Sequence, residues 1–205
     1  MARMTLEDRR SALVAAALAV IEREGVAGAT ARSIVREAGM PLGSLHYAFS
    51  TVEELLGAAA DEVTTQERLA AERALGDHSQ HSDIASVIRA GFDRYIDLLV
   101  AAPGRELAFL ELTMHAARRR LAAPAAAGTY DESYRLVGAL LTQAAAASGV
   151  RWTIAETELA RHTVSMLDGI TTTWLADHDT EAARSTARFY AHALASHTAA
   201  LAADG

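Results

Sequence analysis

Residues 30–49 of the chain read TARSIVREAGMPLGSLHYAF, and this stretch predicts two short helices joined by a tight turn. Thr30 is a good N-cap for the first helix, which should end at Ala38 because a glycine follows. Pro41 suits the first turn of the second helix, where its missing N–H costs nothing, and this helix should end near Phe49. Two short helices with a glycine at the turn are typical of a helix-turn-helix unit.

The second helix of this pair is predicted to carry a binding surface. It is too short to be stable alone, so it must pack against its neighbours through an apolar side made by Ile34, Ala38, Leu45 and Phe49. The remaining face should point outward, and it consists of Leu42, Gly43, Ser44, His46 and Tyr47. In helix-turn-helix proteins this helix enters the major groove of DNA. The alternative is a helix that only packs in a bundle, with His46 and Tyr47 half-buried.

The segment before this pair is predicted to be an amphipathic helix from about Thr5 to Glu24, with Thr5 and Asp8 at its N-terminal cap. Its apolar residues Leu13, Ala17, Val20 and Ile21 recur with the spacing of one helix face. A secretory leader is the alternative, but Glu7 and Asp8 spoil its basic start. The apolar run is also too short for a bilayer, which needs about 20 residues. We therefore expect a cytoplasmic protein with no membrane segment.

The composition favours helix along the whole chain of 205 residues, which has three prolines and no cysteine. No stretch shows sustained strand alternation, so the predicted fold is all-α with about nine helices. Two S/T-x-x-E patterns, Ser50 with Glu53 and Thr153 with Glu156, predict capping boxes. They should open a helix from Thr51 to about Leu75 and another ending at about Ala176. The other predicted helices span residues 84–101, 105–121, 130–147 and 181–203.

From Arg9 to Leu56 the sequence RRSALVAAALAVIEREGVAGATARSIVREAGMPLGSLHYAFSTVEELL resembles the DNA-binding domain of the TetR family of bacterial transcriptional repressors. The shared features are the basic start, the E-x-G close of the first helix, T-x-R-x-I, A-G before the turn, and G-S-L-x-Y-x-F followed by E-E-L-L. The resemblance implies a DNA-binding domain in residues 1–50 and a ligand-binding and dimerisation domain in residues 51–205. It also implies DNA contacts from Thr30, Arg32, Leu42, Gly43, Ser44, His46, Tyr47 and Thr51.

Two positions depart from the family pattern. The family commonly has lysine where this chain has Leu42 and Val52, which removes two cations from the DNA-binding surface. We expect Arg3, Arg9 and Arg10 to compensate from the N-terminal arm, and Leu42 could touch a thymine methyl group. Arg32 could read guanine bidentately, and Tyr47 should donate its hydroxyl to a phosphate.

A ligand pocket is predicted in the remaining helices, because several aromatic and methionine side chains lie beside polar groups there. The candidates are Phe92, Tyr95, Phe109, Thr113, Met114, His115, His162 and Met166. For any one aromatic or methionine among them, an ordinary core position is the commoner alternative. Residues 51–205 hold 13 arginines against 21 acids, which favours a neutral or cationic effector.

The last two helices are predicted to form a homodimer interface, because small alanines on them permit close packing against a two-fold mate. The candidates are Leu167, Ile170, Trp174, Tyr190, Leu194 and His197. The alternative is that the last helix only packs on its own domain. A dimer would double the contacts that one helix-turn-helix makes with DNA.

Patterns for catalysis, metal binding or cofactor binding are weak. His78 with His81, Glu111 with His115, and Glu158 with His162 each supply at most half of a metal site. Phosphate-loop and nucleotide-binding fingerprints are absent from the sequence. We therefore expect no metal, no cofactor and no enzymatic activity. The predicted function is a repressor that a small molecule releases from a palindromic double-stranded DNA operator. The rival is an all-helical ligand carrier or enzyme whose first helices only pack.

Overall fold

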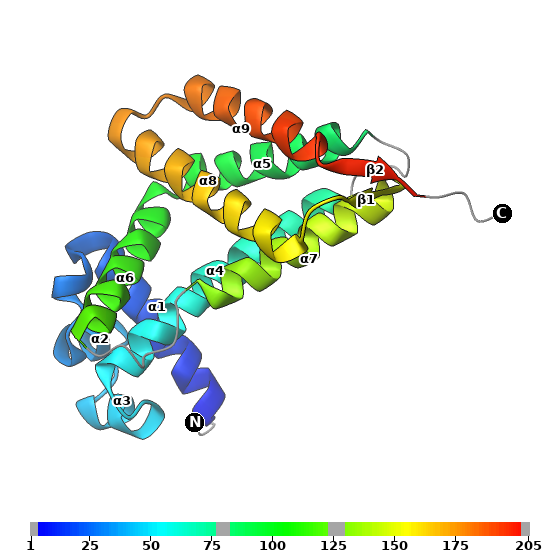
Figure 1. Cartoon of the computed structure of the whole chain (residues 1–205). Coiled ribbons are helices and arrows are strands. Elements are labelled where there is room, and N and C mark those ends of the chain that lie inside the picture. Colours follow the sequence, from blue (N-terminus) through cyan, green and yellow to red (C-terminus); the bar gives the residue numbers. More distant parts are fainter. Residues whose placement is uncertain (1–3, 77–82, 123–129, 202–205) are drawn as a thin grey trace. The chain divides into compact units, whose positions relative to one another are not determined.

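The computed structural model of the chain describes residues 4–76, 83–122 and 130–201, in which nine α-helices and two short strands form (Figure 1). The predicted all-α class is confirmed. His78, His81 and Arg3, which the sequence analysis considered, lie outside the described residues. The chain forms two compact units. The first unit comprises residues 1–65 and 104–129, and the second comprises residues 66–103 and 130–205.

The first unit begins with α1 (Leu6–Glu24), which has the predicted cap. The Asp8 N–H donates to the Thr5 hydroxyl at 3.0 Å, and the Asp8 carboxylate accepts from the Thr5 N–H in return. The helix ends at Gly25, whose φ of 73° favours glycine. The predicted apolar stripe of Leu13, Ala17, Val20 and Ile21 is buried, so the amphipathic interpretation of this segment is confirmed.

The helix-turn-helix pair follows a single 3₁₀ turn, η1 (Val26–Gly28). Helix α2 (Ala31–Glu37) is capped by Thr30, whose hydroxyl accepts from the Ser33 N–H at 3.2 Å. Gly39 makes the turn with a φ of 64°, and α3 (Leu42–Ala48) begins one residue later than predicted because Pro41 is its N-cap residue. The two predicted short helices and the glycine turn between them are thus confirmed.

Two further helices complete the first unit. Helix α4 (Val52–Gly76) belongs to it as far as Thr65, and α6 (Pro103–Ala122) from Gly104 onward. The capping box predicted at Ser50 and Glu53 is wrong by one position. The Glu54 N–H donates to the Thr51 hydroxyl at 3.0 Å, and the Ser50 N–H donates to the Glu54 carboxylate at 2.8 Å.

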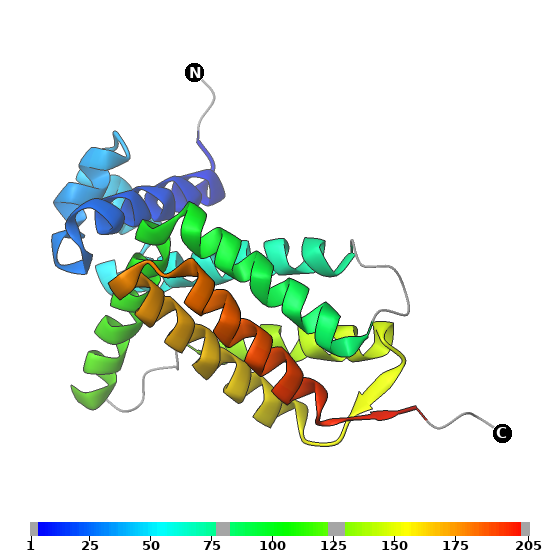
Figure 2. The same ribbon diagram turned by 90° about the horizontal axis from the view of Figure 1, so that it is seen from above.

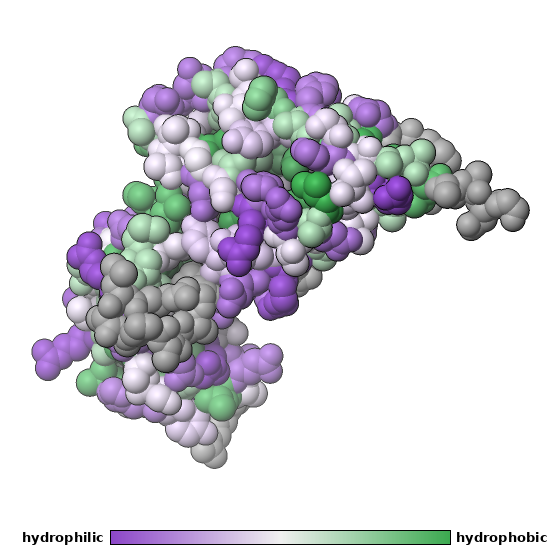
Figure 3. Space-filling model, in the orientation of Figure 1, coloured by the Kyte–Doolittle hydropathy of each residue, from purple (hydrophilic) through white to green (hydrophobic). Residues whose placement is uncertain are grey.

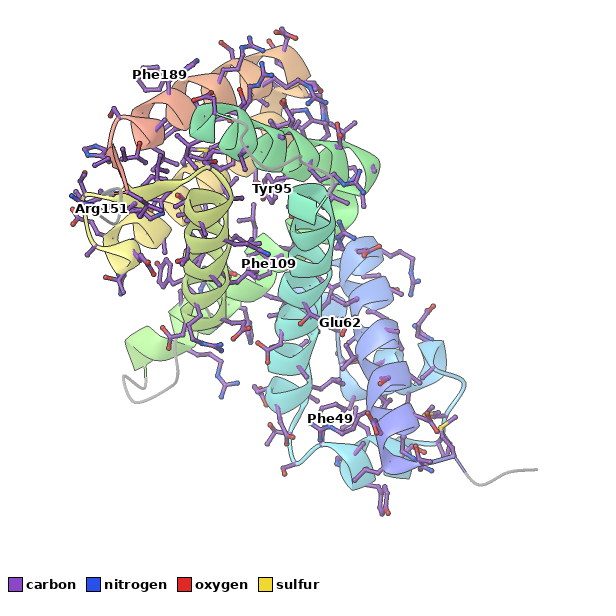
Figure 4. The ribbon with its side chains drawn as sticks, turned by 90° about the vertical axis from the view of Figure 1, so that its right-hand side faces the viewer. Phe49, Glu62, Tyr95, Phe109, Arg151 and Phe189 are labelled. Atoms are coloured by element: carbon purple, nitrogen blue, oxygen red, sulfur yellow. The ribbon has the colours of Figure 1, made fainter. Side chains whose placement is uncertain are left out.

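The core of the first unit joins residues that are distant in the sequence. Helices α1, α2, α3 and α4 bury one continuous apolar cluster, in which Phe49 is fully enclosed (Figure 4). Ala108, Phe109 and Leu112 of α6 belong to the same cluster. The compact unit therefore extends beyond the functional boundary predicted at residue 50, which stays a prediction.

The second unit is built from α5 (Ile84–Ala101), α7 (Asp131–Ala147), α8 (Glu156–Asp177) and α9 (Thr180–Ala195). Helix α9 lies beside α5 and α8, and α7 packs against α8 (Figures 1 and 2). Asp83 and Asp179 cap α5 and α9 through their carboxylates. Arg184 of α9 ties the helices together at the surface, since it pairs with Asp93 at 3.0 Å and Asp97 at 2.6 Å on α5.

A small β-ribbon corrects the prediction at the end of the described chain. Strand β1 (Val150–Trp152) pairs antiparallel with β2 (Thr198–Ala200), with Arg151 opposite Ala199. The helix predicted to reach residue 203 therefore ends at Ala195. The capping box predicted at Thr153 and Glu156 is also wrong, because the Thr153 N–H and hydroxyl both donate to the His197 carbonyl. Ala155 is the N-cap residue of α8, without a side-chain cap.

The surface of the described helices carries both hydrophilic and apolar residues, as is usual for amphipathic helices. On the face shown in Figure 3, hydrophilic and apolar residues are interspersed over the described helices. Among the described residues, none of the helices combines the length and the apolar character that a membrane-crossing segment needs.

Candidate nucleic-acid interface and ligand cavity

The outer face of the helix-turn-helix pair presents most of the residues that the sequence analysis assigned to DNA. Leu42 is 41% exposed and Tyr47 is 67% exposed on α3. The others that are open to solvent are Thr30, Arg32, Gly43, His46 and Thr51. Tyr47 and His46 are therefore not half-buried packing residues, as the alternative required. The pair offers hydroxyl, imidazole and guanidinium groups on one small surface.

Ser44 does not lie on that open face, contrary to expectation. Its side chain is only 6% exposed, and its hydroxyl accepts a hydrogen bond from Arg9 Nη1 at 3.3 Å. The reason is a long-range contact: α1 approaches α3 and brings Arg9 over this position. Ser44 thus positions a cation, and its own contact with DNA stays a prediction.

Arg9 lies at the edge of the open face. Its guanidinium carbon is 5.3 Å from the centre of the Tyr47 ring, and its Nε is buried without a hydrogen-bond partner among the described residues. Arg9 and Tyr47 border a hollow between the start of α1 and α3. The hollow is lined by Met4, Leu6, Arg9, Pro41, Gly43, Ser44 and Tyr47. A guanidinium beside a phenol hydroxyl and a serine hydroxyl can receive a phosphate oxygen.

Arg10 makes structural contacts within the first unit, and its predicted role as a spare cation for DNA stays a prediction. It donates to the Ala48 carbonyl at the end of α3 and pairs with the Glu54 carboxylate at 3.2 Å. Its guanidinium also stacks over the Phe49 ring, with 4.0 Å between the guanidinium carbon and the ring centre. The Ser50 N–H, and after it Arg10, lowers the pKa of Glu54. Arg10 therefore fastens α1 to the junction of α3 and α4.

The second unit contains a cavity of about 120 Å³ between α5, α7 and α8. Tyr95 (Figure 4) and Phe92 contribute its aromatic wall, and Thr163 contributes a hydroxyl. The described residues that line it are Val87, Ile88, Gly91, Phe92, Tyr95, Leu136, Val137, Leu140, Leu141, Ala144, Thr163 and Leu167. The Tyr95 hydroxyl shares a hydrogen bond of 2.5 Å with the Thr171 hydroxyl.

The predicted ligand-binding residues are divided between different environments. Phe92 and Tyr95 line the cavity, Met166 is buried in the core of the second unit, and His162 lies on the surface beside Glu158 at 3.5 Å. The four predicted residues of α6 belong to the first unit: Phe109 and Thr113 are buried there, Met114 is exposed and His115 is half-buried. Their role in ligand binding stays a prediction.

Sequence reasoning missed most of the cavity wall. The contribution of α7 consists of leucine, valine and alanine, which look like ordinary core residues in a sequence. Thr163 carried a usable signal, because a threonine within an apolar stripe of α8 is a polar group that needs a partner. Its side chain is 3% exposed.

The predicted dimer residues are also divided. Ile170, Trp174 and Leu194 are buried inside their own unit, where Trp174 Nε1 donates to the Thr180 hydroxyl at 2.9 Å. Leu167 lines the cavity, Tyr190 is half-buried and His197 is exposed. Side chains that are already enclosed in one unit leave little surface for a partner. The large apolar side chain that α9 does expose is Phe189, at 70% (Figure 4).

One further polar pair is half-buried in the second unit. The Tyr130 hydroxyl donates to the Asp168 carboxylate at 2.5 Å, and the two residues join the start of α7 to α8. Burial raises the pKa of Asp168, and burial followed by the hydrogen bond to Asp168 raises the pKa of Tyr130. Among the described residues, no three acidic or histidine side chains gather closely enough to hold a metal ion.

Comparison with known proteins extends over both units. The family model described as bacterial regulatory proteins, tetR family, matches residues 13–59. The nicotine-responsive transcriptional repressor HdnoR of Paenarthrobacter nicotinovorans is 30% identical over 175 residues, which cover 85% of the chain and 88% of HdnoR.

Solved structures share the fold over nearly the whole length. A structure described as a TetR-family transcriptional regulator from Rhodococcus sp. superposes with a TM-score of 0.73 at 22% sequence identity. The match covers 92% of the present chain and 98% of the Rhodococcus chain. At that identity the likeness shows the fold alone. The multidrug binding protein EbrR, in complex with malachite green, has a TM-score of 0.64 and 29% identity, and the match covers 91% of the chain and 98% of EbrR.

Proposed function

The chain belongs to the TetR family of bacterial regulatory proteins, and on this premise we propose that it is a homodimeric repressor, released from a palindromic DNA operator by a small molecule. It is a DNA-binding, ligand-responsive transcriptional regulator. Family membership favours this function over the rival prediction of a helical carrier or enzyme. The proposal places the protein in the cytoplasm, where its operator would be.

One observation carries the DNA-binding half of the proposal: Arg32 and Tyr47 are both open to solvent on the helix-turn-helix pair. Arg32 at the start of α2 would read guanine through two hydrogen bonds, and Tyr47 would donate to a phosphate. Thr30, Gly43, His46 and Thr51 would contact the backbone or base edges around them. Leu42 would meet a thymine methyl group in place of the lysine common in the family.

Arg9 adds a cation that the sequence analysis placed only in the N-terminal arm. Its guanidinium lies beside Tyr47 and is held by Ser44, so it is oriented before DNA arrives. An arginine that is already ordered loses less conformational entropy on binding a phosphate. Arg10 is occupied by Glu54 and the Ala48 carbonyl, so Arg9 would carry the compensation for the two missing lysines.

We propose dimerisation through the exposed faces of α8 and α9. Phe189 is a large apolar side chain on that surface, and it packs edge-on against Tyr190 with ring centres 5.7 Å apart. Two copies would present two α3 helices to half-sites one DNA turn apart, about 34 Å. Such an arrangement explains why one short recognition helix can suffice for specific binding.

The cavity of the second unit would hold the effector. HdnoR is named for its response to nicotine, and EbrR was solved with malachite green and with ethidium, so relatives of comparable length respond to or bind organic ring compounds. The effector would bind more tightly to a dimer with a different spacing of the two α3 helices. The loss of DNA-binding free energy cannot exceed the difference in effector binding free energy between the two conformations. Helix α4, which continues from the first unit into the second, would carry this coupling.

A gel-shift experiment at physiological salt tests the function. The purified protein, shown to be folded and dimeric by light scattering, is incubated with DNA upstream of its own gene and with an unrelated fragment of equal length. The proposal expects a specific band that survives about 150 mM salt and competitor DNA. A folded dimer that binds both fragments equally would contradict it.

A further inference from the structure

The cavity of the second unit has walls that restrict the chemistry of its occupant. We infer that it accepts a compact, uncharged and mostly apolar ring compound that offers one hydrogen-bond acceptor to the Thr163 hydroxyl. This inference rests on the proposed function, in which the second unit binds the effector, and it specifies the class of that effector.

The described lining residues are uncharged, and this argues for an uncharged ligand. The residues that line the cavity include no carboxylate, no arginine and no histidine among those that the structure describes. A charged group that leaves water for an apolar cavity needs a partner of opposite charge, and without one it loses several kcal/mol of hydration. The described part of the wall would therefore disfavour carboxylates and permanent cations, whereas aliphatic and aromatic surfaces lose little there.

Thr163 supplies the hydrogen bond. Its side chain is 3% exposed, and its hydroxyl oxygen has no hydrogen-bond partner among the described residues. Buried hydroxyl groups are normally satisfied, so an orphan on a residue that lines a cavity points to a partner in the cavity, which a small rearrangement of the wall would admit to this enclosed oxygen. A threonine commonly returns its hydroxyl to the carbonyl four residues earlier in a helix, and Thr163 does not.

The hydroxyl of Thr163 is better placed to donate than to accept. Unpaired buried donors are rarer than acceptors with an unused lone pair, so the proton is the part that most requires a partner. The second hydroxyl in the lining belongs to Tyr95, and it is already hydrogen-bonded to Thr171. One acceptor on the ligand, directed at α8, therefore satisfies the site without breaking an existing bond.

The volume of the cavity suits a ligand of about one ring. Its volume is about 120 Å³. An apolar cavity of about 150 Å³ in another protein holds benzene, and sites for drug-sized ligands need about 300 Å³ or more. Phe92 and Tyr95 on one side and the leucines of α7 on the other provide flat and aliphatic surfaces for such a ring.

Four probes of similar size test the inference on the full-length protein without DNA. Benzene is the apolar reference, pyridine at pH 8 adds one neutral acceptor, N-methylpyridinium adds a positive charge, and benzoate adds a negative charge. Dissociation constants come from titrations followed by saturation-transfer NMR. We expect benzene and pyridine to bind, and both charged probes to bind at least about tenfold more weakly. Equal binding of either charged probe overturns the inference.

Substitutions at position 163 test the acceptor. Thr163→Val keeps the shape and removes the hydroxyl, so the ratio of pyridine affinity to benzene affinity should fall by about three- to tenfold. Thr163→Ser retains the hydroxyl and should keep the wild-type ratio. Thr172→Val, at an exposed position of the same helix, is the matched control. An unchanged ratio in Thr163→Val, or the same change in Thr172→Val, overturns the assignment of Thr163.

These measurements separate the inference from the proposed function. If pyridine binds as expected but a saturating concentration does not alter the gel shift, the ligand class stands and the release mechanism fails. If DNA is bound specifically but the uncharged probes do not bind, the regulator stands and the assignment of the cavity is overturned.

Discussion

The Glu111 carboxylate of α6 accepts a hydrogen bond from the Val26 N–H at 2.7 Å, across 85 residues of sequence. Val26 opens the 3₁₀ turn that leads into α2, and its N–H has no partner within that turn. The same carboxylate leaves little room beside Gly25, where an added Cβ would meet Glu111 Oε2 at 3.1 Å. Helix α6 is thus anchored to the chain segment that positions the helix-turn-helix pair.

Glu111→Ala should destabilise the first unit by about 1–3 kcal/mol, because a hydrogen bond to a charged acceptor is lost and a partly buried N–H remains. Glu111→Gln retains an oxygen acceptor and should cost less. Both tryptophans, Trp152 and Trp174, lie in the second unit, so their fluorescence in a urea titration reports on that unit. Circular dichroism reports on both units. The destabilisation of the first unit should therefore appear in the circular dichroism signal and not in tryptophan fluorescence.

Glu53→Gln is the matched control for this pair of variants. Glu53 also joins α4 to α6, through an exposed ion pair with Arg119 at 3.5 Å. Exposed pairs contribute about 0–1 kcal/mol, so its loss should be small. If Glu53→Gln and Glu111→Ala cost the same, the special role of Glu111 is refuted.

Tyr47→Phe should weaken DNA binding about evenly across operator sequences, by about fivefold, because a single phosphate hydrogen bond is lost. Fluorescence anisotropy with a panel of single-position operator variants measures this. A sequence-dependent loss would mean that the Tyr47 hydroxyl reads a base instead.

Arg32→Ala should cost about 1–3 kcal/mol of binding free energy on the preferred operator and relax specificity at one position. Arg36→Ala, also exposed on α2, removes the same charge from a position with no predicted DNA contact. An equal effect of both substitutions on all operator variants would show that only the net charge matters.

Gly91→Ala should stabilise the second unit by about 1 kcal/mol, since alanine has the higher helix propensity and its Cβ would meet no heavy atom within 4 Å. Because Gly91 lines the cavity, the new methyl group should also weaken the binding of benzene. Gly57→Ala on α4 has the same open space but lies in the first unit, so it should leave benzene binding unchanged. Thermal unfolding followed by tryptophan fluorescence, with NMR titration, tests both effects.

Asp168→Asn should raise the free energy of unfolding at pH 7. Burial raises the folded-state pKa of Asp168 above its unfolded value of about 3.9, so the folded chain binds this proton more tightly. The contribution of the group to stability is therefore full below the unfolded pKa and falls as pH rises through the folded pKa. Asparagine still accepts from the Tyr130 hydroxyl and carries no charge to bury.

The gain from Asp168→Asn should shrink as the pH is lowered through the folded-state pKa of Asp168, because the wild-type carboxyl then becomes neutral as well. Urea titrations at several pH values measure it, with Asp131→Asn at an exposed position as control. A gain that is independent of pH would show that the charge of Asp168 is not the cause.

Local signals in the sequence predicted much of the fold. The caps at Thr5 and Thr30, the glycine turn at Gly39 and the helix of residues 84–101 all follow from rules that act within one or two helical turns. The shift of a cap from Ser50 to Thr51 shows the precision of such rules, since both residues can serve and Glu54 decides between them.

The errors arise from contacts between distant segments. The alanines after Ala195 favour helix, but backbone pairing with residues 150–152 makes them a strand. The burial of Ser44 depends on Arg9, which only the packing of α1 on α3 brings near. The α7 wall of the cavity could likewise not be predicted from the sequence, because its leucines differ from core leucines only in the residues that lie opposite them.

The interleaving of the two units has a consequence for exchanging parts among relatives. The first unit is not a contiguous cassette, since Phe109 and Glu111 of α6 complete its core and its 3₁₀ turn from across the intervening α5. A chimera that transplants only the N-terminal 65 residues would contain the helix-turn-helix pair without the α6 contacts that stabilise it. A chimera should therefore transfer the operator specificity of the donor only if it also includes α6. The alternative is to match the residues of α6 that pack against the first unit to those of the recipient.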